Sequence, residues 1–243
     1  MKIAKNNSTK HEIFKIALSG VILALALLFD LIGKAFPNIF GFLKLNFSLI
    51  PILFGTYLVG KKYGLVILFL NFLIGPVFPD ANSIDIRYLG SFAILIVHSV
   101  FILTQIGVFS LILKISKNWL ELISRKNKFL KYYIVYSISI IVAISITILI
   151  ISTINTFLIN LIYLKLFFKE SFSLTVMLEK YSETFKNLFF GIDNYFLGSY
   201  TIYIVFNLIN LIVNTFIITL IWIIDWKTKF ISNFRRKYNH ISY

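Results

Sequence analysis

The stretch YYIVYSISIIVAISITILIISTINTFLINLIYLKLFF occupies residues 132–168 and contains a single charged residue, Lys165. About 20 consecutive apolar residues suffice to cross the hydrocarbon core of a bilayer. This run is longer, so it predicts a tilted membrane span or a span whose last turns project from the membrane. A soluble fold of 243 residues could not bury it within a chain that is 58% hydrophobic. The sequence therefore predicts an all-α integral membrane protein.

Further apolar runs set the number of spans. Hydropathy predicts spans at 13–32, 49–59, 63–78, 88–115, 132–168 and 197–224, together a six-transmembrane-helix bundle. The second and third are short, so they could form two tilted helices or one re-entrant hairpin, and we favour two helices. The predicted organisation is a basic segment at 1–12, a membrane domain at 13–224 and a basic segment at 225–243. The first helix is expected to stay uncleaved, and an amphipathic helix is expected around 173–188.

The positive charge lies on one side of the predicted bundle. With the N-terminus inside, the inside segments hold 17 Lys and Arg residues against three acids. The outside segments hold seven basic and seven acidic residues, so the whole net charge of +14 lies inside. Because cytoplasmic loops carry the excess of Lys and Arg, both termini are expected in the cytoplasm of a protein of the plasma membrane.

Catalytic chemistry is disfavoured. The chain has no cysteine, which excludes disulfides and thiolate metal sites. Its three histidines are scattered, and we expect His98 to hydrogen-bond a neighbouring helix rather than a ligand. No P-loop, zincin helix or nucleophile elbow is present, and no acid pair lies deep in a span. The sequence predicts a protein that is not an enzyme and that uses no metal and no cofactor.

Uncharged polar side chains recur at helical spacing in the last two predicted spans. They are Ser152, Thr156, Asn160 and Tyr163 in the fifth span, and Asn207, Asn210 and Asn214 in the sixth. An asparagine amide offers two donors and an acceptor oxygen, which suits a neutral, hydroxyl-rich or heteroaromatic ligand. The same groups could instead join helices through interhelical hydrogen bonds. The pattern leaves both interpretations open.

The segment after the first predicted span carries the most specific pattern. It reads LKLNFSLIP at 43–51, with Lys44 two residues before Asn46, and Pro51 is followed nine residues later by Gly60 and then Gly64. This resembles the substrate-binding subunits of energy-coupling factor (ECF) transporters, in particular the riboflavin and flavin nucleotide branch. In that branch a Lys-x-Asp-Phe-Ser-x-x-Pro pattern enters the second helix and Gly-x-x-x-Gly follows.

Further positions agree with the same branch. Asn155 and Tyr163 keep the eight-residue spacing of its fifth helix, and Phe206-Asn207 matches a Phe-Asn pair of its sixth. Four positions depart from the pattern, because each has lost the charged or amide residue of the family. They are Asn46 for aspartate, Asn210 and Asn71 for lysine, and Ser91 for asparagine. The missing cations argue against a phosphorylated ligand, which would need charge-assisted donors.

Small residues form one face of the first predicted span. Ala17, Gly20 and Ala24 recur at three- and four-residue spacing and would let another helix approach closely. From the residues alone, this face could pack inside the bundle or dock a partner. The resemblance implies the second use, as the interface with the transmembrane coupling subunit.

The resemblance implies a vitamin-binding function without ATP hydrolysis. It implies a ligand site in the outer half of the bundle, closed by the loop between the first two helices, and partnership with a coupling subunit and two cytosolic ATPases. The implied substrate-binding residues are Lys44, Asn46, Asn71, Ser91, Asn155, Tyr163, Asn207 and Asn210. Riboflavin is the expected vitamin. Pantothenate, folate or a pyridine-type vitamin on the same scaffold, or a membrane scaffold protein without a ligand, are the alternatives.

Overall fold

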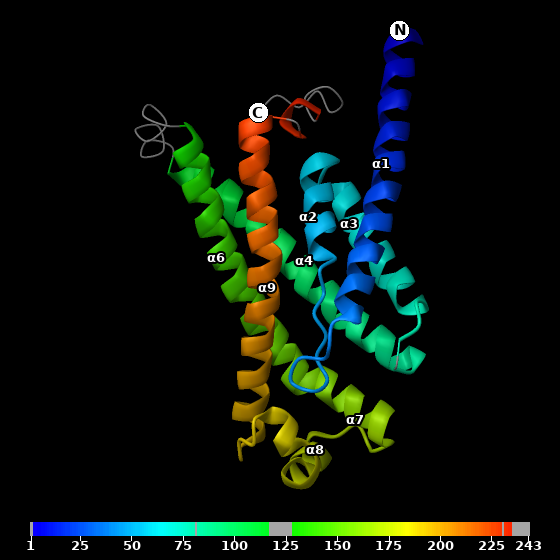
Figure 1. Cartoon of the computed structure of the whole chain (residues 1–243), viewed down its shortest axis with the longest axis vertical. Coiled ribbons are helices and arrows are strands. Elements are labelled where there is room, and N and C mark those ends of the chain that lie inside the picture. The colour runs from blue at the N-terminus through cyan, green and yellow to red at the C-terminus, as the bar shows by residue number, and fades with distance from the viewer. Residues whose placement is uncertain (1, 81, 117–127, 230, 235–243) are drawn as a thin grey trace. The chain divides into compact units, whose positions relative to one another are not determined.

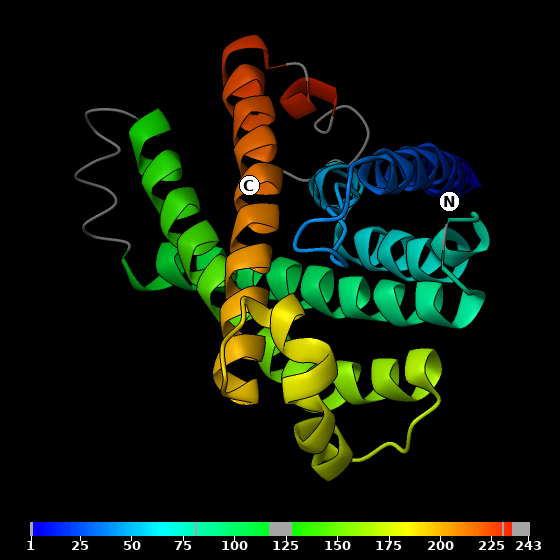
Figure 2. The ribbon, with the colours of Figure 1, turned by 60° about the horizontal axis from the view of Figure 1, so that its bottom comes forward.

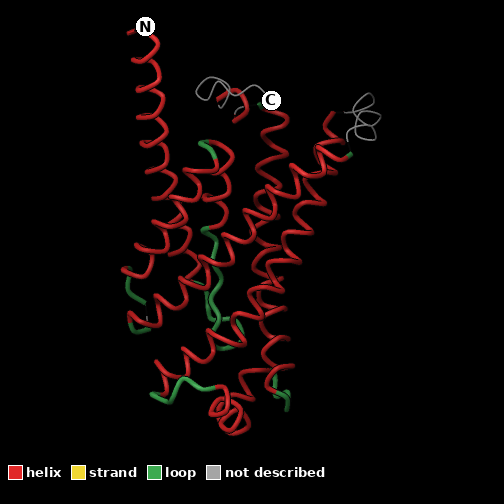
Figure 3. Tube along the Cα trace, turned by 180° about the vertical axis from the view of Figure 1, so that it is seen from behind, coloured by secondary structure: helices red, strands yellow, loops and turns green. Residues whose placement is uncertain are grey.

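The computed structural model describes residues 2–80, 82–116, 128–229 and 231–234. Every regular element in these ranges is helical, and only an isolated bridge between Ile39 and Leu43 has β geometry (Figure 3). Four helices are long and apolar enough to cross a membrane, at His11–Ala35, Ile84–Ile115, Phe129–Phe168 and Tyr195–Thr228. The predicted all-α membrane protein is confirmed at this level. Parts of the predicted cytoplasmic segments, at 117–127 and 235–243, lie outside the described residues.

The chain divides into two compact units. Unit 1 comprises Met1–Pro37, Lys44–Phe78 and Ile212–Tyr243, and unit 2 comprises Asn38–Leu43 and Pro79–Leu211. Unit 1 contains α1 (Lys2–Ala35), α2 (Leu49–Leu58), α3 (Lys61–Ile74) and the 3-10 turn η1 (Gly75–Val77). In this unit α1, α2 and α3 pack against one another (Figure 1).

The predicted Gly60 and Gly64 pair builds the turn between α2 and α3. Gly60 has a φ of 125°, a conformation that residues with a side chain rarely adopt. A Cβ at Gly64 would lie 2.0 Å from Oγ1 of Thr56, so only glycine lets α3 approach α2 this closely. At about 1.5 Å per residue, α2 is about 15 Å long and α3 about 21 Å, each shorter than a hydrocarbon core of about 30 Å. The number of spans therefore depends on how this hairpin lies in the membrane.

Unit 2 holds the chain from Pro79 to Leu211. It contains α4 (Ile84–Ile115), α6 (Lys128–Ile154), the π turn η2 (Asn155–Ile159) and α7 (Asn160–Phe168). There follow α8 (Leu174–Lys180), the π turn η3 (Tyr181–Phe185), the 3-10 turn η4 (Lys186–Phe189) and α9 (Tyr195–Thr228), whose residues from Ile212 belong to unit 1. The helical turns from Leu174 to Phe189 agree with the amphipathic helix expected there. They lie beside the start of α9 (Figure 2).

Helix ends in unit 2 follow ordinary capping chemistry. Asp85 lies in the first turn of α4 and Lys114 in its last turn, where each charge complements the helix dipole. Before α9, Oδ1 of Asn194 accepts a hydrogen bond from the backbone N–H of Leu197 at 3.0 Å. This bond satisfies a donor that the first turn of a helix leaves unpaired. The bond fixes where α9 begins and therefore which of its side chains face α7 and η2.

Candidate functional site

The polar stripe predicted in the fifth span lies on a helix with an altered turn. In a regular α-helix, residues four positions apart are rotated by about 40° around the axis. After three such steps the last side chain would point about 120° away from the first and would no longer share its face. Here Ser152, Thr156, Asn160 and Leu164 are all buried. The π turn η2 lies between them, with the N–H of Asn160 bonded to the carbonyl of Asn155. The wider turn keeps the stripe on one face, and π turns occur frequently at functional sites.

Asn160 is the centre of a buried hydrogen-bond network with α9. Its Nδ2 donates to the hydroxyl oxygens of Tyr195 and Ser199, both at 3.1 Å, and its Oδ1 accepts from the hydroxyl of Tyr203. The hydroxyls of Thr156 and Ser199 share a hydrogen bond at 2.8 Å, and Tyr195 donates to the carbonyl of Thr156 at 2.6 Å. For these residues the polar stripe joins two helices through hydrogen bonds, which is the second of the two interpretations that the sequence left open.

Asn155 differs from Asn160 although it lies on the same helix. The residue is 6% exposed, and its amide makes no hydrogen bond with any residue that the structure describes. Nearby on α7, Tyr163 is partly buried, and its ring stacks on Phe167 with centroids 5.3 Å apart. The amide atoms of Asn155 keep a small solvent-accessible surface, so they remain open to an incoming partner. Asn155 is therefore the predicted residue of unit 2 that is best placed to bond a ligand.

The other predicted residues of unit 2 lie on α4 and α9. Ser91 is partly buried on α4. On α9, Asn207 is buried and its Nδ2 donates to the carbonyl of Tyr203 at 2.7 Å, and Asn210 is buried as well. His98 is buried on α4, and its Nδ1 has no hydrogen-bond partner within the described ranges. The expected bond from His98 to a neighbouring helix is therefore not found at this atom.

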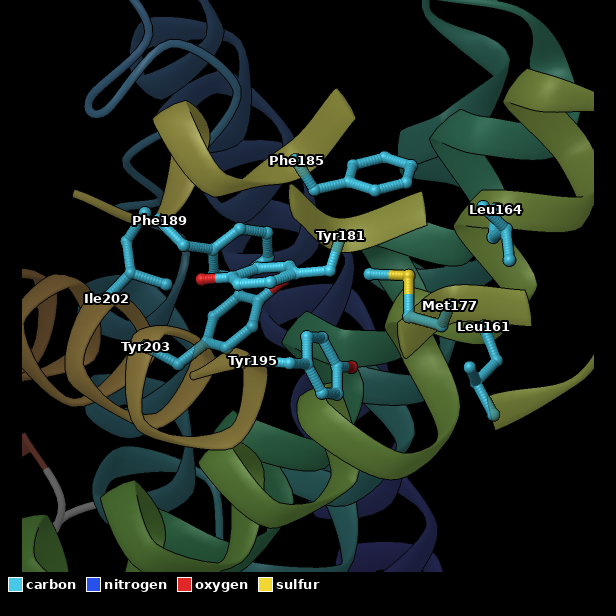
Figure 4. Packing of buried hydrophobic residues seen from close by; sticks show 9 residues of the cluster. All are labelled: Leu161, Leu164, Met177, Tyr181, Phe185, Phe189, Tyr195, Ile202 and Tyr203. Atoms are coloured by element: carbon cyan, nitrogen blue, oxygen red, sulfur yellow. The ribbon is translucent and has the colours of Figure 1, made fainter. Parts of the chain in front are cut away.

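An aromatic cluster, whose members are shown in Figure 4, shares Tyr195 and Tyr203 with the Asn160 network. Its buried members come from α7, from the segment 174–189 and from α9: Leu161, Leu164, Met177, Tyr181, Phe185, Phe189, Tyr195, Ile202 and Tyr203. The hydroxyl of Tyr181 donates to the carbonyl of Ile192 at 2.8 Å. Burial raises the pKa of Tyr181, and the charge of Asp193 raises it further, so this hydroxyl stays a protonated donor.

The loop after α1 covers this cluster. Residues 39–43 form a tight turn closed by two backbone bonds between Ile39 and Leu43, of 2.6 and 3.0 Å. Phe40 packs edge-on against Phe190 with centroids 4.9 Å apart, and Phe42 lies edge-on to Tyr203 at 6.5 Å. Phe40 and Phe190 both have positive φ, of 52° and 60°. Non-glycine residues adopt this conformation at an energetic cost, and such strain is concentrated at ligand clamps and switch regions.

In unit 1 the predicted loop residue Asn46 belongs to a buried ionic cluster. Asp30 is 4% exposed and forms a salt bridge with Lys34 at 2.8 Å. Nδ2 of Asn46 donates to Oδ1 of Asp30 at 2.5 Å, and Lys34 also donates to the carbonyl of Gly75 at 3.0 Å. The cluster joins the end of α1, the segment before α2 and the end of α3.

Asn46 uses both ends of its side chain within this cluster. Its Oδ1 accepts from the backbone N–H of Ser48 at 3.0 Å and from the hydroxyl of Ser48 at 2.7 Å. Of the other predicted residues in unit 1, Lys44 is partly buried. Asn71 is buried on α3, and its Oδ1 lacks a partner among the residues that the structure describes. Asn71 thus offers an acceptor, whereas Asn46 is committed to holding the loop.

The predicted docking face on α1 is exposed. Ala17, Gly20 and Ala24 are exposed, and a Cβ added at Gly20 would meet no atom within 4 Å. Large apolar neighbours on the same helix, Ile16 and Val21, are also exposed. The small residues therefore do not serve packing among the described elements, which was the alternative interpretation.

Several of the residues that build these sites were missed in the sequence. Tyr195, Ser199 and Tyr203 bond Asn160, and their four-residue spacing was a signal that could have identified them. Asp30 and Lys34 were counted only as outside charges, although their i, i+4 spacing at the end of an apolar helix indicated an ion pair.

The geometry defines an all-helical membrane protein with a polar and aromatic site in unit 2. Among the described residues no group of three His, Cys, Asp or Glu side chains could hold a metal ion. Comparison with protein-family models, curated proteins and solved structures finds no match to this chain.

Proposed function

We propose that this protein is the substrate-binding subunit of an ECF-type importer that captures a neutral vitamin, riboflavin first among the candidates. The observation that carries the proposal is the loop 38–43, which seats Phe40 and Phe42 on the aromatic cluster of unit 2. A loop of this kind can close over a ligand, and aromatic rings suit a flat heteroaromatic one because offset and edge-on ring contacts are favourable.

In this proposal, polar groups on η2 and α7 would fix the orientation of the ligand. The amide of Asn155 on η2 makes no hydrogen bond to the described residues, and Tyr163 carries a hydroxyl on α7, which follows directly. Ligand sites are mostly apolar with a few convergent polar groups, which matches this composition.

In this proposal α2 and α3 complete a six-segment membrane domain with both termini in the cytoplasm. The irregular segment 44–48 leads directly into α2. At about 3.3 Å per residue for an extended chain it adds about 16 Å to the 15 Å of α2, which together approach the thickness of the hydrocarbon core. Asn46 and Ser48 are buried in protein, where irregular backbone is tolerated at membrane depth.

The exposed face at Ala17, Gly20 and Ala24 would dock the coupling subunit, which with two ATPases would drive release of the vitamin to the inside. The face is open and carries small residues at the spacing that favours close helix contact.

The test is ligand capture by the purified full chain. Riboflavin added to the detergent-solubilised protein should lose fluorescence on stoichiometric binding, and protein purified from cells should carry a yellow chromophore. Phe42→Ala should weaken binding. The control is the same substitution at the exposed Phe69 in unit 1, and Phe69→Ala should leave binding unchanged. If pantothenate, folate or a pyridine vitamin binds and riboflavin does not, that vitamin becomes the proposed substrate. Failure of all of them to bind would refute the proposed function.

A further inference from the structure

At one end of unit 1, two segments of the chain contact α1. The hydroxyl of Tyr63, in the first turn of α3, donates to the carboxylate of Glu12. The ring of Phe14 packs against Phe234, with centroids 5.8 Å apart. Positions two residues apart in an α-helix lie about 200° apart around the axis and about 3 Å apart along it. The start of α3 and the segment 231–234 therefore flank α1 on opposite sides at one level.

The segment 231–234 is held in place by the end of α9. The helix ends at Thr228, and Lys229 follows in the left-handed conformation with a φ of 54°. Oδ1 of Asp225 then accepts the backbone N–H of Ile231 at 2.6 Å, and Oδ2 accepts the hydroxyl of Ser232 at 2.6 Å. This corner connects the end of α9 to the segment that carries Phe234 to α1.

At this end of unit 1 the acidic side chains already have hydrogen-bond or salt-bridge partners, whereas four lysines form no salt bridge with the described residues. Glu12 pairs with Lys15 at 3.2 Å and with Tyr63, and Asp225 is bonded to the corner just described. Four exposed lysines form no salt bridge with any residue in the described ranges, and together we name them the lysine belt. They are Lys61 and Lys62 at the start of α3, and Lys227 and Lys229 at the end of α9.

The lysine belt lies at a sharp boundary of polarity. On α3 the exposed apolar residues Leu65 and Val66 follow within about one turn of Lys62. On α9 the exposed Ile224 comes one turn before the end of the helix, and Trp226 is exposed beside it. Apolar surface followed by tryptophan and lysine is the order found where a helix leaves the acyl chains and enters the headgroup layer.

We propose that the lysine belt binds the phosphate-containing headgroups of anionic phospholipids. The cations come from two separate helix ends, the start of α3 and the end of α9, which suits several headgroups around the protein better than one soluble anion. The adjoining exposed apolar side chains would contact the acyl chains of the same lipids. The inference does not depend on what unit 2 binds.

The test compares lipid retention by the full chain in detergent, with phosphatidylglycerol and phosphatidylcholine as the probes in native mass spectrometry. Wild-type protein should retain phosphatidylglycerol in preference to phosphatidylcholine, and the preference should weaken with salt. Replacing the four lysines by glutamine should reduce affinity for phosphatidylglycerol by about fivefold for each lysine removed. Replacing them by arginine should preserve it, which separates lost charge from lost folding.

A matched control is available in unit 2, where Lys165 and Lys169 are also exposed. Their change to glutamine should leave retention of phosphatidylglycerol unaltered. Equal retention of both lipids by the wild type, or an equal loss in this control, would overturn the proposal. Displacement of bound phosphatidylglycerol by millimolar inorganic phosphate would also overturn it, because it would assign the belt to a soluble anion.

Discussion

Asn155, which begins the π turn η2, and Asn160, which follows it, should respond to truncation in opposite ways. The Asn160 side chain takes part in three buried hydrogen bonds, with Tyr195, Ser199 and Tyr203. At about 0.6–1.5 kcal/mol for each bond, Asn160→Ala should lower the free energy of unfolding by about 2–4 kcal/mol. In a chain of this size that corresponds to a fall of roughly 5–15 °C in Tm.

Asn155→Ala removes no hydrogen bond to the described residues, so we expect its Tm to stay close to that of the wild type. If the Asn155 amide bonds the vitamin, the same change should weaken binding by about tenfold, equivalent to about 1.4 kcal/mol. Flavin fluorescence quenching gives the affinity, and thermal unfolding of the same samples gives Tm. A large fall in Tm for Asn155→Ala with unchanged affinity would refute the distinction between the two residues.

Three further predictions concern unit 1 and the position of the chain in the membrane. Asn46→Asp places a second carboxylate beside buried Asp30 and should lower the free energy of unfolding by about 2–3 kcal/mol, measured as a fall in Tm. Asn46→Ser removes the amide without adding a charge, so it should lower Tm by less. Gly20→Leu should leave Tm and vitamin binding unchanged but stop transport by the assembled importer, so normal uptake would remove this face from the coupling interface. In intact cells a cysteine at Asn82 should react with an impermeant thiol reagent and one at Lys62 should not, and the reverse pattern would exclude the proposed orientation.

Membrane insertion and the helix positions could be predicted because hydropathy depends on local composition. The run at 132–168 is helical throughout, and the predicted short helices at 49–59 and 63–78 are α2 and α3. Hydropathy does not determine how such short helices cross a bilayer, because length alone cannot separate a re-entrant hairpin from two spans. The path of residues 44–48 into α2 is fixed by the tertiary contact between Asp30 and Asn46. A hydropathy average over neighbouring residues cannot detect such a contact.

The roles of individual polar residues were less predictable. Asn155 and Asn160 are the same residue type five positions apart, yet one is fully bonded and the other is not. The difference arises from α9, which places Tyr195, Ser199 and Tyr203 opposite Asn160. A stripe in one helix shows that polar groups share a face, but the facing helix decides whether they are already satisfied.

The two π turns of unit 2 connect this bonding to the aromatic cluster. Met177, Tyr181, Phe185 and Phe189 repeat every four residues through η3, as the polar stripe does through η2. A regular α-helix would turn such a repeat away from its partner by about 40° at each step. A π turn has more residues per turn, which offsets this rotation and keeps both stripes facing α9. That helix contributes Tyr195 and Tyr203 to the hydrogen-bond network and to the aromatic cluster. A change in the register of α9 would therefore alter the polar network around Asn160 and the aromatic cluster together.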